Sequence, residues 1–395
     1  MTDFEFLMLV LTALYLSECC LWVRRSAVVF RTIFRRRCAV TRPPSGLGSP
    51  QGGLVFLNPL PPFGAAFVCH PWPVSLAAEG AYSYVAQTVH PEGRLDQTAR
   101  CIPIEDLANA TSASGAVYVQ EQPFVHLGDP EAAAHYARVL RFLSAIPWAQ
   151  RDTAIRSELA TATDTQAITW RVTTYRRATW SLRLWCHLMF AIVFVGFPAI
   201  VRFHQARVFW PWLVVLFVVC LGAILRGFYK AHRQLMPFAV EERWRSLAIM
   251  ILTPTAAIRA CDRLSRCLLA AYHPLAVAMV LCPEQELRAF GRRVLLDVKH
   301  PLQPVCPEDA GPGRSIEASF RAALAAALDA LVVRAGYDPA VWTEPPRAED
   351  PSSLSYCPRC DAEYILEEGL CHRCGGVPLQ SFSPKQRDNT IRETS

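Results

Sequence analysis

Two apolar stretches near the middle of the chain constrain its fold more than any other feature. Leu184–Val201 and Val208–Leu225 each contain 18 residues without a formal charge. A helix rises about 1.5 Å per residue, so each stretch can just cross about 30 Å of lipid hydrocarbon. Only the six residues Arg202–Arg207 separate them. The pattern predicts a tight hairpin of two transmembrane helices over residues 184–201 and 208–225.

A third apolar run lies near the start of the chain. Phe4–Val23 is interrupted only by Glu5 and Glu18, it has no basic segment before it, and arginines follow it instead of a small-residue cleavage site. These flanks favour an uncleaved transmembrane anchor over residues 4–23 and not a removable signal peptide. Near the end of such an anchor the Glu18 carboxylate can extend to the membrane surface, and a proton-relay role is the alternative.

Basic residues flank the apolar runs asymmetrically, and this predicts the orientation of the chain. The first run is followed, without an intervening acid, by seven arginines: Arg24, Arg25, Arg31, Arg35, Arg36, Arg37 and Arg42. The hairpin is flanked by cations at Arg171, Arg176, Arg177, Arg183, Arg226, Lys230 and Arg233. The hairpin loop holds only Arg202 and Arg207. Because cytoplasmic flanks carry the excess of Lys and Arg, we expect residues 24–183 and everything after 226 in the cytoplasm and the N-terminus outside.

The location that follows is a bacterial inner (plasma) membrane, which the protein crosses three times. The basic juxtamembrane segment 24–42 then has two interpretations. It is either an interfacial helix that holds anionic lipid or only a topology signal. The high apolar content fits a membrane protein, since 52% of residues are hydrophobic and 19% are charged.

The remaining segments predict a mixed fold in the cytoplasm. Short strand-like runs, followed by a helix that Asp129-Pro130 begins, indicate a small α+β domain over residues 50–165. Residues 226–336 read as a cytosolic or interfacial helical region. Within it, 247–282 is expected to form amphipathic helices that lie on the membrane or pack together, and an extra span is the alternative. The linker 337–355, a cysteine-rich module over 356–382 and a disordered tail over 383–395 complete the chain.

Four of the fifteen cysteines form two spaced knuckles near the C-terminus. Cys357-Pro358-Arg359-Cys360 and Cys371-His372-Arg373-Cys374 are each C-x2-C, with ten residues between them. This spacing resembles the zinc-ribbon family, and the resemblance covers only this module. It implies that one structural Zn²⁺ is bound by four thiolates: Cys357, Cys360, Cys371 and Cys374. Arg359 and Arg373 are placed to offset the negative charge of such a centre, and Gly375-Gly376 allows a left-handed turn.

Two other interpretations of the knuckles stay open at this point. A redox-active dithiol is one, although a single C-x2-C fits that role better than a spaced pair. The other is that His372 replaces a cysteine as a ligand. Four thiolates held for a metal require a reducing compartment, which agrees with a cytoplasmic C-terminus.

The expected function is that of a membrane-anchored scaffold or adaptor. The module is acidic on balance, because Asp361, Glu363, Glu367 and Glu368 outnumber its two arginines. This favours a protein partner and makes nucleic acid unlikely. Only three of the 40 basic residues are lysines, so the high arginine content is most simply explained by a GC-rich genome. A nucleic-acid binder with a contiguous arginine face is therefore the third choice.

An enzyme is disfavoured because no nucleophile, metalloprotease or phosphate-binding motif occurs in the sequence, and no small-molecule substrate is identifiable. The runner-up is nevertheless a membrane enzyme or transporter accessory subunit with a site in residues 50–165. It predicts a pocket that gathers groups such as His70, His90 and Glu105.

Overall fold

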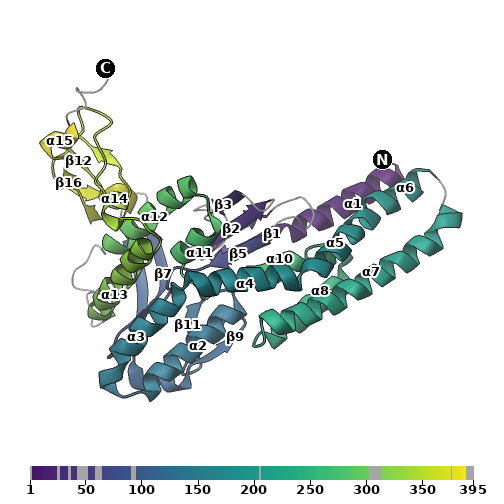
Figure 1. Ribbon diagram of the computed structural model, residues 1–395, viewed down its shortest axis with the longest axis horizontal. Helices are drawn as coiled ribbons and strands as arrows, with labels where there is room; N and C mark the ends of the chain where they lie inside the picture. The colour runs from purple at the N-terminus through teal and green to yellow at the C-terminus, as the bar shows by residue number, and fades with distance from the viewer. Residues whose placement is uncertain are drawn as a thin grey trace.

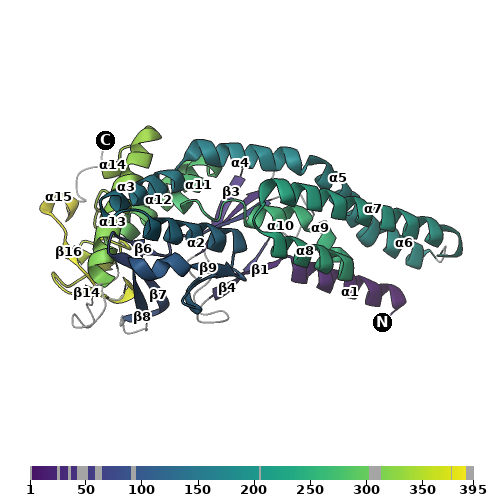
Figure 2. The same cartoon turned by 90° about the horizontal axis from the view of Figure 1, so that it is seen from below.

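The computed structural model describes residues 2–24, 27–33, 37–41, 52–57, 65–89, 95–203, 206–301, 313–374 and 376–387. Antiparallel strands and helices form a central body (Figure 1). A helical hairpin projects from one end of this body, and the C-terminal cysteine module lies at the other end (Figures 1 and 2).

The hairpin contains the two predicted central spans. Its first arm is one continuous helix built from α5 (Trp180–Ala191), a π-helical turn η2 (Ile192–Gly196) and α6 (Phe197–Arg202), and its second arm is α7 (Ala206–Leu235). The apolar helices Trp180–Arg202 and Phe209–Leu235 have 23 and 27 residues, each with a mean hydropathy of 2.2. Their most apolar windows are only 33% and 17% buried. By length and composition, both helices can cross a membrane.

The π-helical turn in the first arm has a local cause. Pro198 has no N–H to donate, and its ring crowds the preceding helical turn. The wider η2 turn directly before α6 accommodates this proline. Gly196 at the same place lets the second arm approach, since a Cβ there would lie 3.1 Å from Leu213 Cδ1.

The N-terminal apolar run is a shorter helix than predicted. Helix α1 spans Asp3–Glu18, and a capping box begins it, in which Thr2 Oγ1 accepts from Glu5 N and Glu5 Oε2 accepts from Thr2 N. Its 16 residues cover about 24 Å. The predicted helical residues 20–23 instead belong to strand β1 (Cys20–Arg24), because β4 (Gly52–Phe56) offers them a pairing partner. Helix α1 packs against α6, with its N-terminus near the tip of the hairpin (Figures 1 and 2).

In the described residues, four small antiparallel sheets follow α1. The pair β1–β4 forms the first, and β3-β2-β5, β6-β7-β8 and β11-β10-β9 form the others. The remaining strands are β2 (Val28–Ile33), β3 (Arg37–Thr41), β5 (Ala65–Cys69), β6 (Ser75–Leu76), β7 (Gly80–Val89), β8 (Leu95–Pro103), β9 (Thr111–Ala113), β10 (Ala116–Val119) and β11 (Gln122–His126). The α+β part therefore begins at residue 20 and not at residue 50.

The basic segment 24–42 is not an interfacial helix in its described residues. Strand β2 buries Val28 and Phe30 in the main core and Val29 in a second apolar cluster, so both of its faces are covered. β-branched and aromatic residues favour this extended, buried conformation. Arg25, Arg35, Arg36 and Arg42 lie outside the described residues.

Helices pack against the strands and against one another in the body. They are η1 (Ile104–Asn109), α2 (Pro130–Ala145), α3 (Trp148–Ala162) and α4 (Thr165–Ala178), followed after the hairpin by α8 (Val240–Leu252), α9 (Pro254–Ile258), α10 (Ala260–Arg266) and α11 (Pro274–Leu281). Asp129 caps α2 as predicted, since its Oδ1 accepts from Ala132 N at 2.8 Å.

Residues 247–282 pack within the protein for most of their length. Helices α9, α10 and most of α11 are buried, and Ser265 of α10 exchanges hydrogen bonds of 2.8 and 3.0 Å with the backbone of Ala66 in β5. Only the end of α8 exposes large apolar side chains, at Ile251 and Leu252. Of the expected arrangements, mutual packing holds for α9–α11, because the sheet provides an apolar surface for them.

The last helices close the body and hold the module. They are α12 (Glu284–Lys299), α13 (Gly313–Arg334) and α14 (Pro339–Trp342). One apolar core runs from Tyr15 to Trp342, so the predicted pieces 50–165 and 226–336 share a single interior. The predicted linker 337–355 is partly structured. Its Trp342 packs so closely on α12 that a Cβ at Gly291 would lie 2.2 Å from Trp342 Cζ3.

Candidate metal centre

The cysteine module is built from very short strands and two turns. Its strands are β12 (Ser355–Tyr356), β13 (Glu363–Tyr364), β14 (Leu370–Cys371), β15 (Val377–Pro378) and β16 (Gln380–Ser381), in sheets β13-β12-β16 and β14-β15, with a 3-10 turn η4 (His372–Cys374). Helix α15 (Pro384–Arg387) occupies the start of the predicted disordered tail, because Gln386 Oε1 accepts from Ser383 N and Oγ. Residues 388–395 lie outside the described residues.

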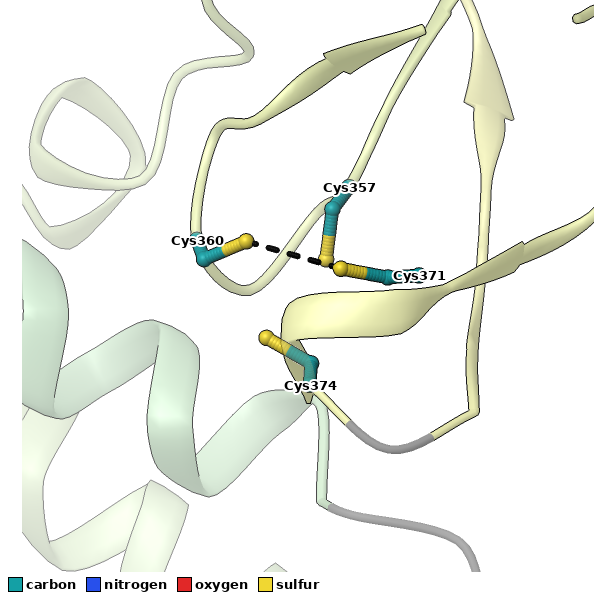
Figure 3. A group of neighbouring side chains, drawn as sticks. All are labelled: Cys357, Cys360, Cys371 and Cys374. Carbon is teal, nitrogen blue, oxygen red and sulfur yellow. Dashed lines mark hydrogen bonds between the residues drawn. The ribbon is translucent and has the colours of Figure 1, made fainter. Parts of the chain in front are cut away.

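The two knuckles bring four sulfur atoms together (Figure 3). The Sγ atoms of Cys357, Cys360, Cys371 and Cys374 all lie within 4.8 Å of one another. Cys360 Sγ and Cys371 Sγ are 3.7 Å apart. Zn–S bonds of about 2.3 Å in a tetrahedron place sulfurs about 3.8 Å apart, whereas a disulfide bond is about 2.05 Å long. The distances fit a shared metal ion, and all four cysteines are free thiols.

Backbone hydrogen bonds hold each knuckle in its turn. Asp361 N donates to Cys357 O and Cys357 N donates to Ala362 O, both at 2.9 Å, and Asp361 adopts a left-handed φ of 57°. In the second knuckle Gly376 N donates to Cys371 O at 3.2 Å, with a φ of 97°. Gly376 thus makes the left-handed turn expected of the glycine pair, while Gly375 lies outside the described residues.

The sulfur cluster forms the core of the module. Cys357, Cys371 and Cys374 are buried with Val377, and Tyr364 and Leu379 pack against them. Tyr364 Oη donates to Cys371 Sγ at 3.1 Å. Hydrogen bonds from the thiols of Cys357 and Cys374 lower the pKa of Cys360 well below its usual range. The cluster therefore favours a thiolate, the form that binds a metal, at Cys360, whereas the same hydrogen bonds raise the pKa values of Cys357 and Cys374. His372 is exposed and is not among the grouped ligand atoms.

Charged side chains of helix α12 bind the first knuckle. Arg359 Nε lies 3.2 Å from Asp297 Oδ1, and its Nη1 donates to His300 O at 3.0 Å. Asp361 receives two hydrogen bonds from Arg292, at 2.9 and 2.8 Å. Arg359 thus contacts α12, and its expected role in offsetting the charge of the thiolates stays a prediction. The sequence offered no signal for Arg292 and Asp297, because they lie more than 60 residues from their partners.

Arg292 also binds the backbone at the end of α14, the segment that leads into the cysteine module. Its Nη1 donates to Trp342 O at 3.1 Å and to Glu344 O at 2.6 Å. One guanidinium therefore joins α12, the segment after α14 and the first knuckle. This arrangement fixes the module on the body instead of leaving it on a free tether.

The other candidate residues do not assemble into a second centre. His70 is buried, Glu105 is exposed on η1, and His90 lies outside the described residues. His273, which precedes Pro274, serves as the N-cap of α11, with Nδ1 accepting from Leu275 N at 3.2 Å. Within the part of the chain that the structure describes, the four cysteines are the only group placed to hold a metal ion.

Comparison with known proteins adds no relative. No protein-family model, curated protein or solved structure matches the chain. Its function is therefore argued from the cysteine cluster, the apolar hairpin and the way that the body connects them.

Proposed function

We propose that the protein is a membrane-anchored scaffold or adaptor whose C-terminal module is a zinc ribbon that binds a protein partner. The observation that carries the proposal is the convergence of four cysteine sulfurs in a module fixed to a body with an apolar hairpin. The module and the hairpin lie at opposite ends (Figure 1). A partner bound at the module would thus be held at a set distance from the membrane.

Zinc is the metal that suits this site. Four thiolates in a tetrahedron are typical of structural Zn²⁺, and iron is the other metal that such a set can hold. Zn²⁺ when bound would join the two knuckles and carry no reaction, since four protein ligands leave no open position. The module's own apolar core is small, so metal binding would supply much of its folding free energy.

The membrane part of the proposal includes α1 as a third helix. Its middle is mostly apolar, with Phe6, Leu9 and Leu14 exposed, as expected for lipid contact. Sixteen residues are short for a crossing, and thinning of the bilayer or extended flanking side chains would accommodate them. The arginine bias supports a bacterial inner membrane with the N-terminus outside and the body and module in the cytoplasm.

The exposed apolar side chains at the end of β13 and the start of β14 would form the partner surface. Ile365, Leu366 and Leu370 are exposed, and the acidic Glu367 and Glu368 lie between them. Exposed apolar groups with a polar rim are typical of protein–protein contact surfaces. The two acids disfavour a nucleic-acid backbone, which requires a basic surface.

Affinity purification from detergent-solubilised membranes tests the adaptor role. The full chain is compared with a Cys357→Ser/Cys360→Ser variant, which should lose the ribbon fold, and with Ile365→Ser/Leu370→Ser, which should keep the metal. A stoichiometric partner that is present with the full chain and lost from both variants is expected. If the full chain and both variants recover the same proteins in equal amounts, the module does not recruit a partner.

A further inference from the structure

A small cavity, lined by both charged and apolar side chains, lies between β1, β5 and the helices α8 and α10. Its volume is about 150 Å³. The walls come from β1, the residue after β5, the turn before α2, the start of α8 and the end of α10. Ligand pockets for larger molecules have volumes of about 300–1,000 Å³, so only a small chemical group fits inside this one.

The buried side-chain atoms of the cavity that lack a partner are all nitrogens. They are Nδ1 of His70, Nε of Arg263, and Nε and Nη2 of Arg266. His70 is only 3% exposed. The arginine nitrogens can only donate, arginine keeps its charge in proteins, and His70 Nδ1 donates in one of its tautomers. Buried donors without acceptors are costly, so this arrangement calls for a ligand with several acceptor oxygens.

The acids of the cavity already have partners of their own. Asp129 Oδ1 accepts from Ala132 N at 2.8 Å, and Glu242 Oε1 accepts from Ser246 Oγ at 3.4 Å. Glu18, at the end of α1, pairs with Arg263 Nη2 and leaves Nε of the same guanidinium without a partner. The cavity therefore has hydrogen-bond donors without acceptors, as a site for an oxyanion has.

An apolar surface borders the cavity on the side of α1. Trp22 lines the cavity and is 54% exposed. Leu54 pairs with Trp22 across the β1–β4 ribbon, Phe56 follows two residues later on the same face, and both are almost half exposed. Leu14 and Leu16 near the end of α1 are also exposed. A cavity with unpaired donors beside an apolar surface, at the end of the apolar helix α1, matches the two halves of an amphiphile.

We propose that this cavity binds a phosphate group, and that the group belongs to the head of an anionic membrane phospholipid. Arg266, Arg263 and His70 would donate to the phosphate oxygens, and Trp22, Leu54 and Phe56 would contact the start of the acyl chains. The site is independent of the metal centre and of the partner surface. It would give the body a specific lipid contact in addition to its apolar helices.

Native mass spectrometry of the full chain in detergent tests the proposal. The probes are dihexanoyl phosphatidylglycerol, dihexanoylglycerol without a phosphate, and inorganic phosphate. The variants are Arg266→Gln, Arg266→Lys and the control Arg226→Gln, which removes an exposed cation of α7 outside the cavity. We expect one bound phosphatidylglycerol, with its affinity weakened about tenfold or more by Arg266→Gln and less by Arg266→Lys. Arg226→Gln should change the affinity by less than about twofold.

Each contrary outcome has a definite meaning. Equal binding of dihexanoylglycerol, or equal weakening by Arg266→Gln and Arg226→Gln, would overturn the site. If inorganic phosphate binds and phosphatidylglycerol does not, the cavity binds phosphate but the phosphate does not come from a lipid. Because Arg266 has buried nitrogens without partners, Arg266→Gln should melt at or above the wild-type temperature without ligand. A lower melting temperature would make Arg266 a structural residue and overturn its role as a ligand contact.

Discussion

At the scale of single residues, several polar side chains are buried for structural reasons and not for catalysis. His273 is an example, since it caps α11 and donates its backbone N–H to Ala162 O at 2.9 Å. Burial lowers its pKa to about 4. The sequence could indicate that a histidine before Pro274 is packed, but the cap depends on the helix that starts there. The lowered pKa of His273 therefore reflects its packing.

His273 makes the folded protein sensitive to acid. A histidine whose pKa is lowered in the folded state stabilises it fully above the unfolded pKa of about 6.5. That stability is lost as the pH falls toward the folded pKa of about 4. His273→Asn keeps a capping acceptor and cannot titrate. Between pH 7 and pH 5, the free energy of unfolding should fall by about 2 kcal/mol less in His273→Asn than in wild type.

Urea unfolding followed by tryptophan fluorescence in detergent, at both pH values, measures this difference. His126→Asn is the control, because His126 is exposed at the end of β11. His70 and His135 have pKa values lowered in the same direction by burial, and they cancel in the comparison because all variants contain them. An equal loss in wild type and His273→Asn would contradict the prediction.

At the scale of elements, the sequence predicted those helices and turns whose positions depend on neighbouring residues in the chain. The uncharged runs around α5–α7 and the start of α2 at Asp129 fall where the pattern indicated them. The knuckles were predictable too, since each C-x2-C turn is closed by its own backbone. The end of α1 was not predictable from the sequence. Residues 20–23 are as apolar as the helix before them, and only pairing with distant β4 makes them a strand.

The same limit applies to the position of the metal module. Nothing near Arg292 in the sequence indicates that it would bind Asp361. Contacts between residues so far apart arise from the tertiary fold, which a local pattern cannot encode. The Pro-rich composition of residues 337–355 consequently predicts a free linker, although contacts of Trp342 and Arg292 hold this segment in place.

Arg292→Ala should release the module from the body without disturbing the hairpin. It removes two bonds to a carboxylate and two to carbonyl oxygens, on partly exposed groups. We expect the local opening free energy of residues 339–366 to fall by about 2 kcal/mol, after allowing for solvent screening. Hydrogen exchange with mass spectrometry measures this as faster exchange in that segment.

Arg288→Ala provides a matched control on the same helix. Arg288 pairs with Glu284 within α12, and both side chains are exposed. Its removal should leave exchange in 339–366 unchanged, because an exposed pair of this kind contributes little. Equally fast exchange in the two variants would show that Arg292 does not hold the module.

At the scale of the whole molecule, a single apolar core runs from the apolar hairpin to Trp342, and the cysteine module has a separate small cluster of its own. The core extends from Tyr15 on α1 to Trp342 beside the first knuckle. The hairpin and the module project from opposite ends of this core (Figures 1 and 2). In the proposed adaptor, this continuity would make the position of the module follow that of the apolar hairpin.

The metal content of the purified full chain tests the central claim most directly. Inductively coupled plasma mass spectrometry should find about one Zn per chain in wild type and almost none in Cys357→Ser/Cys360→Ser. A Cys101→Ser variant is the control, since Cys101 lies in β8, away from the cluster. Iron in place of zinc, or no bound metal in wild type, would contradict the zinc-ribbon account.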